Sequence, residues 1–303
     1  MSRKVLLQLV LPLIGLSVLF WLLAFAPGDK HHQPALLEMS VILRDGDGNV
    51  SAMRKGMEQA AKDLNVELRF LTPAEDNSAV EQVQLLEHEV SGAAPAILLI
   101  PADREALGEA VSAAAGKTTL VTVESDMTAW GADASISMDH QALGEALGKA
   151  ALNGVSFGGT VLLLDSLLGD NGVRERMEAA KALLEEKGRQ VRIYRWTSDS
   201  TAFANILRIE RPKAVIAFEA AALTEMAELS RGEEAFPLLY GCGSTAGIAA
   251  ALEKGRVTAI AAVNVFSAGY LAVEAAAKLA RHESWTGASS VGFSIVRQET
   301  MYS

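Results

Sequence analysis

The chain has 303 residues, 50 % of them hydrophobic and 21 % charged, with a net charge of −10 and a pI near 5.1. This length is at the upper limit of what one hydrophobic core serves, so two lobes of similar size are expected. The acidic balance argues against nucleic acid as a partner, because that binding depends on clustered Lys and Arg. A single cysteine, Cys242, excludes an intrachain disulfide and a thiolate metal cage.

The N-terminus carries a long apolar segment. Arg3 and Lys4 precede an apolar run over residues 5–26. At about 1.5 Å per residue this run is long enough to cross a bilayer core of about 30 Å. The apolar part of a secretory signal usually has only about 7–15 residues. We therefore expect residues 1–27 to form an uncleaved transmembrane signal-anchor helix, with the basic residues inside.

A cleaved signal peptide is the alternative for this segment. Ala24-Phe25-Ala26 resembles a small-x-small cleavage site, although Pro27 follows it directly. Residues 28–35 then form a polar linker. Both interpretations place the rest of the chain outside the cytoplasm.

From residue 36 onward, short apolar strands alternate with longer amphipathic helices. The expected strands of the first series are 39–44, 66–71, 96–100, 119–123 and 135–138. The expected helices are 50–64, 79–90, 104–115 and 141–152. Residues 96–100 are uninterruptedly apolar, which is typical of a strand buried on both faces. The alternation predicts a parallel sheet covered by helices on both sides.

A second series of the same kind starts after Gly158-Gly159. Its expected strands are 160–164, 191–196, 214–218, 238–240 and 257–263. Its expected helices are 173–187, 202–209, 222–230 and 246–253, and a last helix and strand follow at 268–280 and 290–296. We expect an α/β fold of two similar, doubly wound parallel-sheet lobes behind the transmembrane helix.

Five stretches, taken in order, carry a family resemblance: GMEQAA at 56–61, AILLIPAD at 96–103, RERME at 174–178, KAVIAF at 213–218 and AALEKGRVTA at 250–259. From about Glu38 to the end, the chain resembles the type I periplasmic binding proteins of the ribose-binding-like branch, the substrate-binding family of sugar ABC transporters. The resemblance implies a hinge of three crossovers, near Ser137, Asn264 and Ser284. It implies an N-terminal lobe of residues 36–137 plus 265–283 and a C-terminal lobe of residues 138–264 plus 284–303.

The ligand is expected in the cleft between the lobes, because open parallel sheets bind ligands beyond the carboxyl ends of their strands. The candidate ligand-binding residues follow strand ends or lie in the hinge: Asp45, Asp47, Asn49, Glu124, Ser125, Asp126, Arg174, Trp196, Glu219, Ser244 and Asn264. In sugar-binding relatives, polar groups at such positions bind hydroxyls and aromatic rings stack on the sugar. Here Arg174 keeps that pattern and Trp196 offers a stacking face, whereas Glu124-Ser125 and Glu219-Ala220 depart from it.

The chemistry of the ligand has two interpretations at this stage. Carboxylates gather at the expected cleft, and a buried carboxylate is costly unless it is paired, which favours an amine-bearing ligand. Alternatively these acids cap helices or face solvent, and the small polar ligand is a sugar or sugar-like. No metal and no cofactor is expected. Asp45-x-Asp47-x-Asn49 lacks the later ligands of a calcium loop, and Gly46-x-Gly48 lacks the third glycine of a dinucleotide site.

The expected function is that of an extracytoplasmic binding protein which performs no chemistry. No nucleophile elbow, zinc helix or phosphate loop occurs in the sequence. The expected partner is the permease of an ABC importer. The alternative function is that of a ligand-sensing subunit for a membrane sensor kinase. An enzyme on the same scaffold is a third interpretation.

Overall fold

The computed structural model describes residues 35–44, 50–166, 171–232, 236–287 and 289–301. The expected transmembrane segment, residues 1–27, and the linker up to residue 34 lie outside these ranges, as do the candidate residues Asp45, Asp47 and Asn49. Among the residues that are described, no helix combines the length and hydropathy needed to cross a bilayer.

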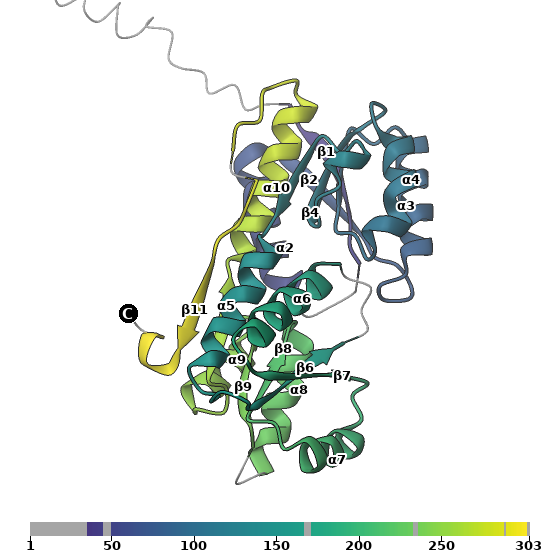
Figure 1. Ribbon diagram of the computed structural model, residues 1–303. Coiled ribbons are helices and arrows are strands. Elements are labelled where there is room, and N and C mark those ends of the chain that lie inside the picture. The colour runs from purple at the N-terminus through teal and green to yellow at the C-terminus, as the bar shows by residue number, and fades with distance from the viewer. Residues whose placement is uncertain (1–34, 45–49, 167–170, 233–235, 288, 302–303) are drawn as a thin grey trace, which may run out of the picture. The chain divides into compact units, whose positions relative to one another are not determined.

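The N-terminal lobe is built on a five-stranded, wholly parallel sheet in the order β2-β1-β3-β4-β5. Its strands are β1 (Leu37–Ile42), β2 (Val66–Leu71), β3 (Ala96–Leu99), β4 (Thr119–Glu124) and β5 (Ala134–Ser137). Its helices are α2 (Val50–Leu64), α3 (Ala79–Ser91), α4 (Arg104–Ala114) and α10 (Val265–Ala280), with the short 3-10 helix η1 (Thr128–Trp130). Figure 1 shows α3 and α4 on one face of the sheet and α2 and α10 on the other.

Strand β3 shows why the sheet is covered on both sides. All of its residues are fully buried. Ala96 and Leu98 pack with α2 and α10, whereas Ile97 and Leu99 pack with α3 and α4. Since successive side chains of a strand point to opposite faces, only a continuous apolar run serves both cores. The prediction of a doubly covered parallel sheet is confirmed here.

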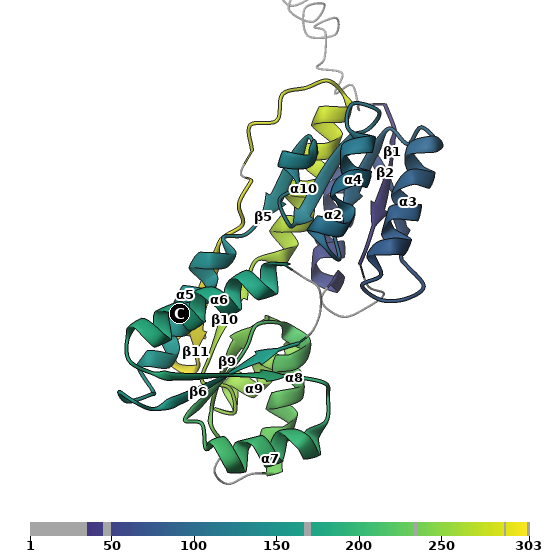
Figure 2. The same ribbon diagram turned by 45° about the vertical axis from the view of Figure 1, so that its right-hand side comes forward.

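The C-terminal lobe repeats the plan with a six-stranded sheet in the order β11-β10-β9-β8-β6-β7, in which only β11 is antiparallel. The strands are β6 (Thr160–Asp165), β7 (Gln190–Arg195), β8 (Ala214–Ala217), β9 (Leu238–Cys242), β10 (Ala259–Val263) and β11 (Phe293–Arg297). The helices are α5 (His140–Leu152), α6 (Asn171–Glu186), α7 (Ser200–Glu210), α8 (Ala220–Leu229) and α9 (Ala246–Glu253), with the short η2 (Ser230–Gly232) and η3 (Gln298–Thr300). Helices α5 and α6 cover one face and α7, α8 and α9 the other (Figure 2).

The chain passes between the two sheets three times. The first passage joins β5 to α5 and the second joins β10 to α10. Before the third, Ser290 pairs with Ser137, and Val291 is only 6 % exposed within the core of the first lobe, where Trp285 also packs. The apolar side chains of Trp285 and Val291 therefore hold the chain in the first lobe beyond Ser284, the expected crossing point.

Candidate ligand-binding cleft

The carboxyl ends of both sheets meet at a cavity of about 440 Å³ lined by residues of both lobes. This volume falls within the range of about 300–1,000 Å³ that is typical of small-molecule sites. The first lobe contributes Arg44 after β1, Lys55 of α2 and Glu124 at the end of β4. The second lobe contributes Arg176 of α6, Glu219 after β8, Cys242 at the end of β9 and the residues from Gly243 to Thr245 that follow it.

Three of the residues predicted from sequence line this cavity. Glu124, Glu219 and Ser244 come from three different strand ends and are brought together here. Gly243, beside Ser244, has a φ of 142°, and a Cβ on it would lie 2.5 Å from Ile248 Cδ1. Only glycine fits this turn, which is what lets β9 end directly at the cavity.

The other described candidates lie outside the lining. Ser125 is 6 % exposed, and its carbonyl accepts a hydrogen bond from Ser135 Oγ at 3.4 Å. Asp126 accepts hydrogen bonds from the backbone N–H and the hydroxyl of Thr128, and it borders a separate cavity of about 370 Å³. Asn264 caps α10 by accepting the Ser267 N–H at 3.1 Å. These polar groups are used for local structure.

Trp196 is a core residue in this structure. It is 6 % exposed, and its ring packs edge-on against Phe203, with ring centroids 5.4 Å apart. Its indole Nε1 donates to Glu225 Oε2 at 2.8 Å. A buried indole with its N–H satisfied presents no face for stacking on a ligand.

The predicted residue Arg174 lies outside the cavity, and Arg176, which was not a candidate, lies at it. Arg174 is exposed, lies outside the cavity lining and donates to Asn171 Oδ1 at 2.7 Å. Arg176 is 8 % exposed and lines the cavity. The two positions are separated by roughly 200° around the helix, so only one of them can face the sheet.

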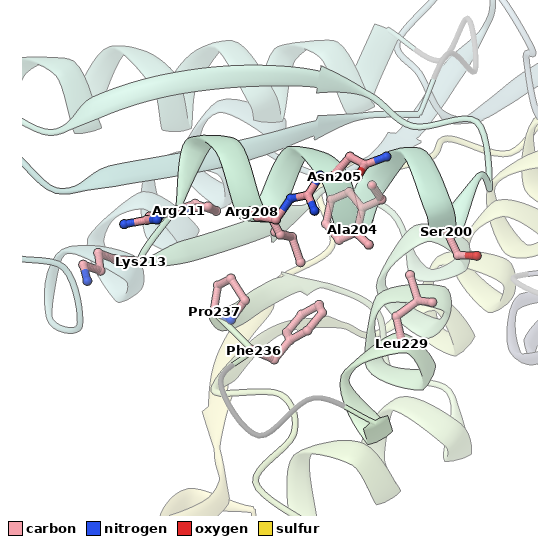
Figure 3. A pocket seen from close by; sticks show the side chains of 12 residues that line it. Ser200, Ala204, Asn205, Arg208, Arg211, Lys213, Leu229, Phe236 and Pro237 are labelled. Atoms are coloured by element: carbon pink, nitrogen blue, oxygen red, sulfur yellow. Dashed lines mark hydrogen bonds between the residues drawn. The ribbon is translucent and has the colours of Figure 1, made fainter.

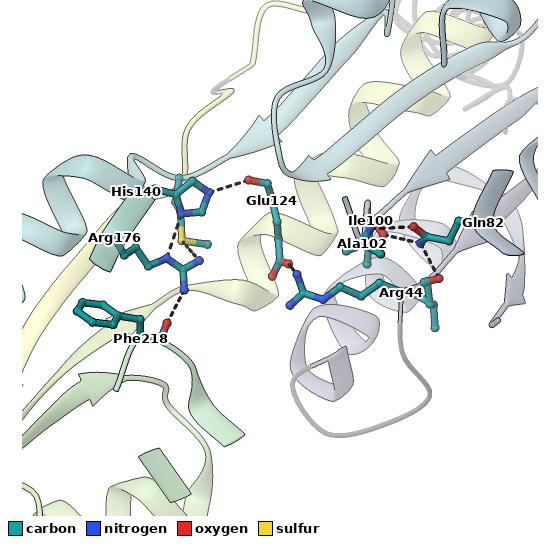
Figure 4. A network of polar contacts seen from close by, with 10 residues as sticks. Arg44, Gln82, Ile100, Ala102, Glu124, His140, Arg176 and Phe218 are labelled. Carbon is teal, nitrogen blue, oxygen red and sulfur yellow. Dashed lines mark hydrogen bonds and ion pairs between the residues drawn. The ribbon is translucent and has the colours of Figure 1, made fainter. Parts of the chain in front are cut away.

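A polar network joins the two lobes beside the cavity (Figure 4). Arg44 Nη1 lies 3.0 Å from Glu124 Oε2, and the carbonyl of Glu124 lies 2.9 Å from His140 Nε2. Arg176 Nε donates to His140 Nδ1 at 3.0 Å, and Arg176 Nη1 donates to the Phe218 carbonyl at 2.9 Å. Because a guanidinium only donates, Nδ1 must accept, and the neutral imidazole carries its proton on Nε2, from which it donates to Glu124.

Glu124 occupies a special position in this network. Its φ is 70°, in the left-handed region that residues other than glycine rarely adopt. This conformation lies at the last residue of β4, where the carbonyl meets His140 and the carboxylate meets Arg44. Strained backbone of this kind is held by its surroundings and is concentrated at functional sites.

The thiol of Cys242 also borders the cavity and is 5 % exposed. Burial raises the pKa of this thiol, and the neighbouring Arg176 guanidinium only partly opposes that effect. The thiol is therefore protonated at neutral pH, which is the opposite of what a cysteine nucleophile needs.

A second set of contacts joins the lobes between the first turns of α4 and α6. Arg104 Nη2 lies 3.3 Å from Glu175 Oε1, and Asn171 donates to Glu105 Oε2. The hydrogen bond from Asn171, together with the charges of Arg104 and Arg174, holds the pKa of Glu105 below its usual value. Helix α4 follows β3 and helix α6 follows β6, so these contacts lie at the carboxyl ends of the strands in both sheets.

Another cavity, of about 620 Å³, lies entirely within the second lobe (Figure 3). Its lining includes Arg208 of α7 and the segments Pro212-Lys213 and Phe236-Pro237. Those segments directly precede β8 and β9, so this cavity lies at the amino ends of the strands. Parallel sheets place their ligand sites at the opposite, carboxyl ends.

Comparison with known proteins finds solved structures of the same fold. Among solved structures, the carbohydrate transporter solute-binding protein from Agrobacterium radiobacter in complex with D-arabinose has a TM-score of 0.82 at 17 % identity, covering 89 % of this chain and 97 % of that chain. An ABC transporter solute-binding protein from Agrobacterium vitis with bound D-fucose has a TM-score of 0.81 at 19 % identity, covering 88 % and 97 %. The XylFII–LytSN complex has a TM-score of 0.80 at 16 % identity, covering 88 % and 100 %.

At such identities these structures show a shared fold. No curated protein matches the chain. A family model described as the periplasmic binding protein domain matches residues 40–284, well over half of the sequence. The chain therefore belongs to the periplasmic binding protein family.

Proposed function

We propose that this chain is an extracytoplasmic solute-binding protein that captures a small polar ligand, a sugar or a sugar-like compound, and presents it to the permease of an ABC importer. The observation that carries the proposal is the cavity of about 440 Å³ at the carboxyl ends of both sheets, with polar side chains from each lobe. Solved structures of the same fold hold D-arabinose and D-fucose and are named as transporter binding proteins, which supports this ligand class.

Binding is expected to close the two lobes around the solute. Three chain passages connect the lobes, so a hinge motion changes the cavity without unfolding either core. The ligand shifts this equilibrium by its higher affinity for the closed form, and the permease recognises that form.

The test is a binding measurement on full-length protein purified in mild detergent. Solutes released on denaturation are identified by mass spectrometry, and those found are titrated by calorimetry. Ser244→Trp places a large ring in the cleft and is expected to weaken binding about tenfold or more, a loss of about 1.4 kcal/mol. Asn205→Trp, which alters the cavity within the second lobe, is expected to leave the affinity unchanged. If Asn205→Trp weakened binding and Ser244→Trp did not, the ligand would bind in the cavity within the second lobe instead.

The extracellular part of a sensor kinase is the alternative partner. The XylFII–LytSN complex contains a chain of this fold in a protein complex, which supports a protein partner other than a permease. A fixed membrane anchor favours local signalling of this kind. Co-purification of the ligand-loaded protein from its own membranes distinguishes a permease from a kinase.

We also propose that residues 1–27 stay attached and anchor the protein to the membrane. The apolar run over residues 5–26 and the preceding Arg3 and Lys4 support this orientation. A C-terminally tagged protein is expected to sediment with membranes, to resist extraction by high salt and to retain the mass of the complete chain. A product shortened after Ala26 and released from the membrane would show that the segment is a cleaved signal.

A further inference from the structure

The guanidinium of Arg176 is a buried cation at the surface of the cleft. The residue is 8 % exposed and lines the cavity. It donates Nε–H to His140 Nδ1, one Nη1–H to the Phe218 carbonyl and one Nη2–H to Met138 Sδ, at 3.0, 2.9 and 3.5 Å. The guanidinium also contacts the thiol of Cys242, which borders the same cavity.

The thiol of Cys242 is neutral, and so are these three acceptors of Arg176. They are an imidazole nitrogen, a peptide carbonyl and a thioether, and no carboxylate in the described part of the chain forms an ion pair with this guanidinium. A buried charge is costly unless a counter-charge is paired with it. An anion in the adjoining cavity would supply that counter-charge.

A second cation reaches the same cavity from the other lobe. Lys55 of α2 lines the cavity and is exposed, with no hydrogen bond or ion pair in the described part of the chain. The described lining thus carries Arg44, Lys55 and Arg176 against Glu124 and Glu219. Because Arg44 is paired with Glu124 at 3.0 Å, the carboxylate of Glu124 is already neutralised. This charge balance does not favour an amine-bearing ligand, which is one of the two interpretations of the sequence.

We infer that the ligand of this cleft is an acidic sugar-like solute, whose carboxylate or phosphate group is bound between Arg176 of one lobe and Lys55 of the other. The inference rests on the proposed function, because it assigns the chemistry of the same site. A guanidinium donates charge-assisted hydrogen bonds to anionic oxygens, and the ammonium group of Lys55 acts as a point charge. An anion placed between cations from opposite lobes also draws the lobes together, which links charge recognition to closure.

The experiment titrates full-length protein by calorimetry with matched pairs of compounds that differ in the anionic group. The pairs are D-galactose with D-galacturonate, D-glucose with D-gluconate, and D-ribose with D-ribose 5-phosphate. In at least one pair, the acidic member is expected to bind about tenfold or more tightly than its neutral partner. The pair that shows the preference distinguishes a carboxylate from a phosphate. Equal or tighter binding of the neutral members, or no binding of any acidic member, overturns the inference.

Variants show which residues produce the preference. Lys55→Gln removes an exposed charge that has no hydrogen bond or ion pair in the described part of the chain, and it is expected to lower the affinity for the acidic member several-fold and so to reduce the acid preference. Lys62→Gln, an exposed position on the same helix outside the cavity, is the matched control and is expected to change neither. Arg176→Lys keeps a positive charge but lacks the planar guanidinium and its N–H donors, and a larger loss of affinity for the acidic member is expected. An acid preference that survives unchanged in Lys55→Gln overturns the assignment.

Failure of this inference is separable from failure of the proposed function. If a neutral solute binds the wild type and binds the Ser244→Trp variant more weakly, the cleft is the binding site and only the assignment of an anionic group is wrong. Absence of any solute bound in the cleft rejects both.

Discussion

Gln82→Leu is expected to lower the free energy of unfolding by about 3–5 kcal/mol, because it leaves several buried backbone groups without partners. Gln82 is fully buried on α3. Its Nε2 donates to the carbonyls of Leu43 and Ile100 at 2.9 and 2.8 Å, and its Oε1 accepts the Ala102 N–H at 2.8 Å. One side chain thus joins the segments that follow β1 and β3 at the cleft (Figure 4).

Chemical denaturation followed by circular dichroism measures this loss. The control is Gln84→Leu, which makes the same change at an exposed position two residues along the same helix. It is expected to shift stability by no more than about 0.5 kcal/mol. If the two variants were equally stable, the hydrogen bonds of Gln82 would not be what holds these two segments.

Gly144→Ala is expected to destabilise the protein by about 1–3 kcal/mol, although alanine favours a helix over glycine by about 1 kcal/mol. A Cβ on Gly144 would lie 2.1 Å from the carbonyl oxygen of Arg176, where α5 and α6 approach each other backbone to backbone. Backbone does not move aside as the end of a side chain does. The displacement of α6 is also expected to weaken the bond between Arg176 and His140, and hence ligand affinity.

Gly148→Ala is the matched control for this prediction. It lies one turn further along α5, where the nearest atom to a new Cβ is Leu183 Cδ2 at 3.1 Å, the end of a flexible side chain. Thermal denaturation is expected to show a lower midpoint for Gly144→Ala than for Gly148→Ala. Equal midpoints would mean that the two helices can separate at little cost.

The order and type of the elements could be predicted from local patterns. Helix α9 begins and ends where the sequence predicts, and α2 spans its expected residues 50–64. The differences lie at element ends. Helix α10 begins at Val265 rather than at residue 268, because Asn264 caps it. Strand β1 extends from Leu37 to Ile42 because it pairs with β2 along that whole length.

The site was harder to predict, because position after a strand does not determine where a side chain points. Glu124, Glu219 and Ser244 line the cavity, but Trp196 follows β7 at the edge of its sheet and packs into a core instead. Arg176 had no signal that separated it from Arg174, since both belong to one charged stretch at the start of a helix. Lys55 lies within a helix and follows no strand.

The sequence alone determined that two βα series with doubly covered parallel sheets would form, because period and apolar content are local properties of the chain. Only the tertiary structure decided which side chains meet. The pairing of Glu124 with Arg44, the neutral tautomer of His140 and the burial of Arg176 each depend on the approach of segments far apart in sequence. Hydrogen bonds and charges act over a few ångströms, so the chemistry of the cleft follows from that approach.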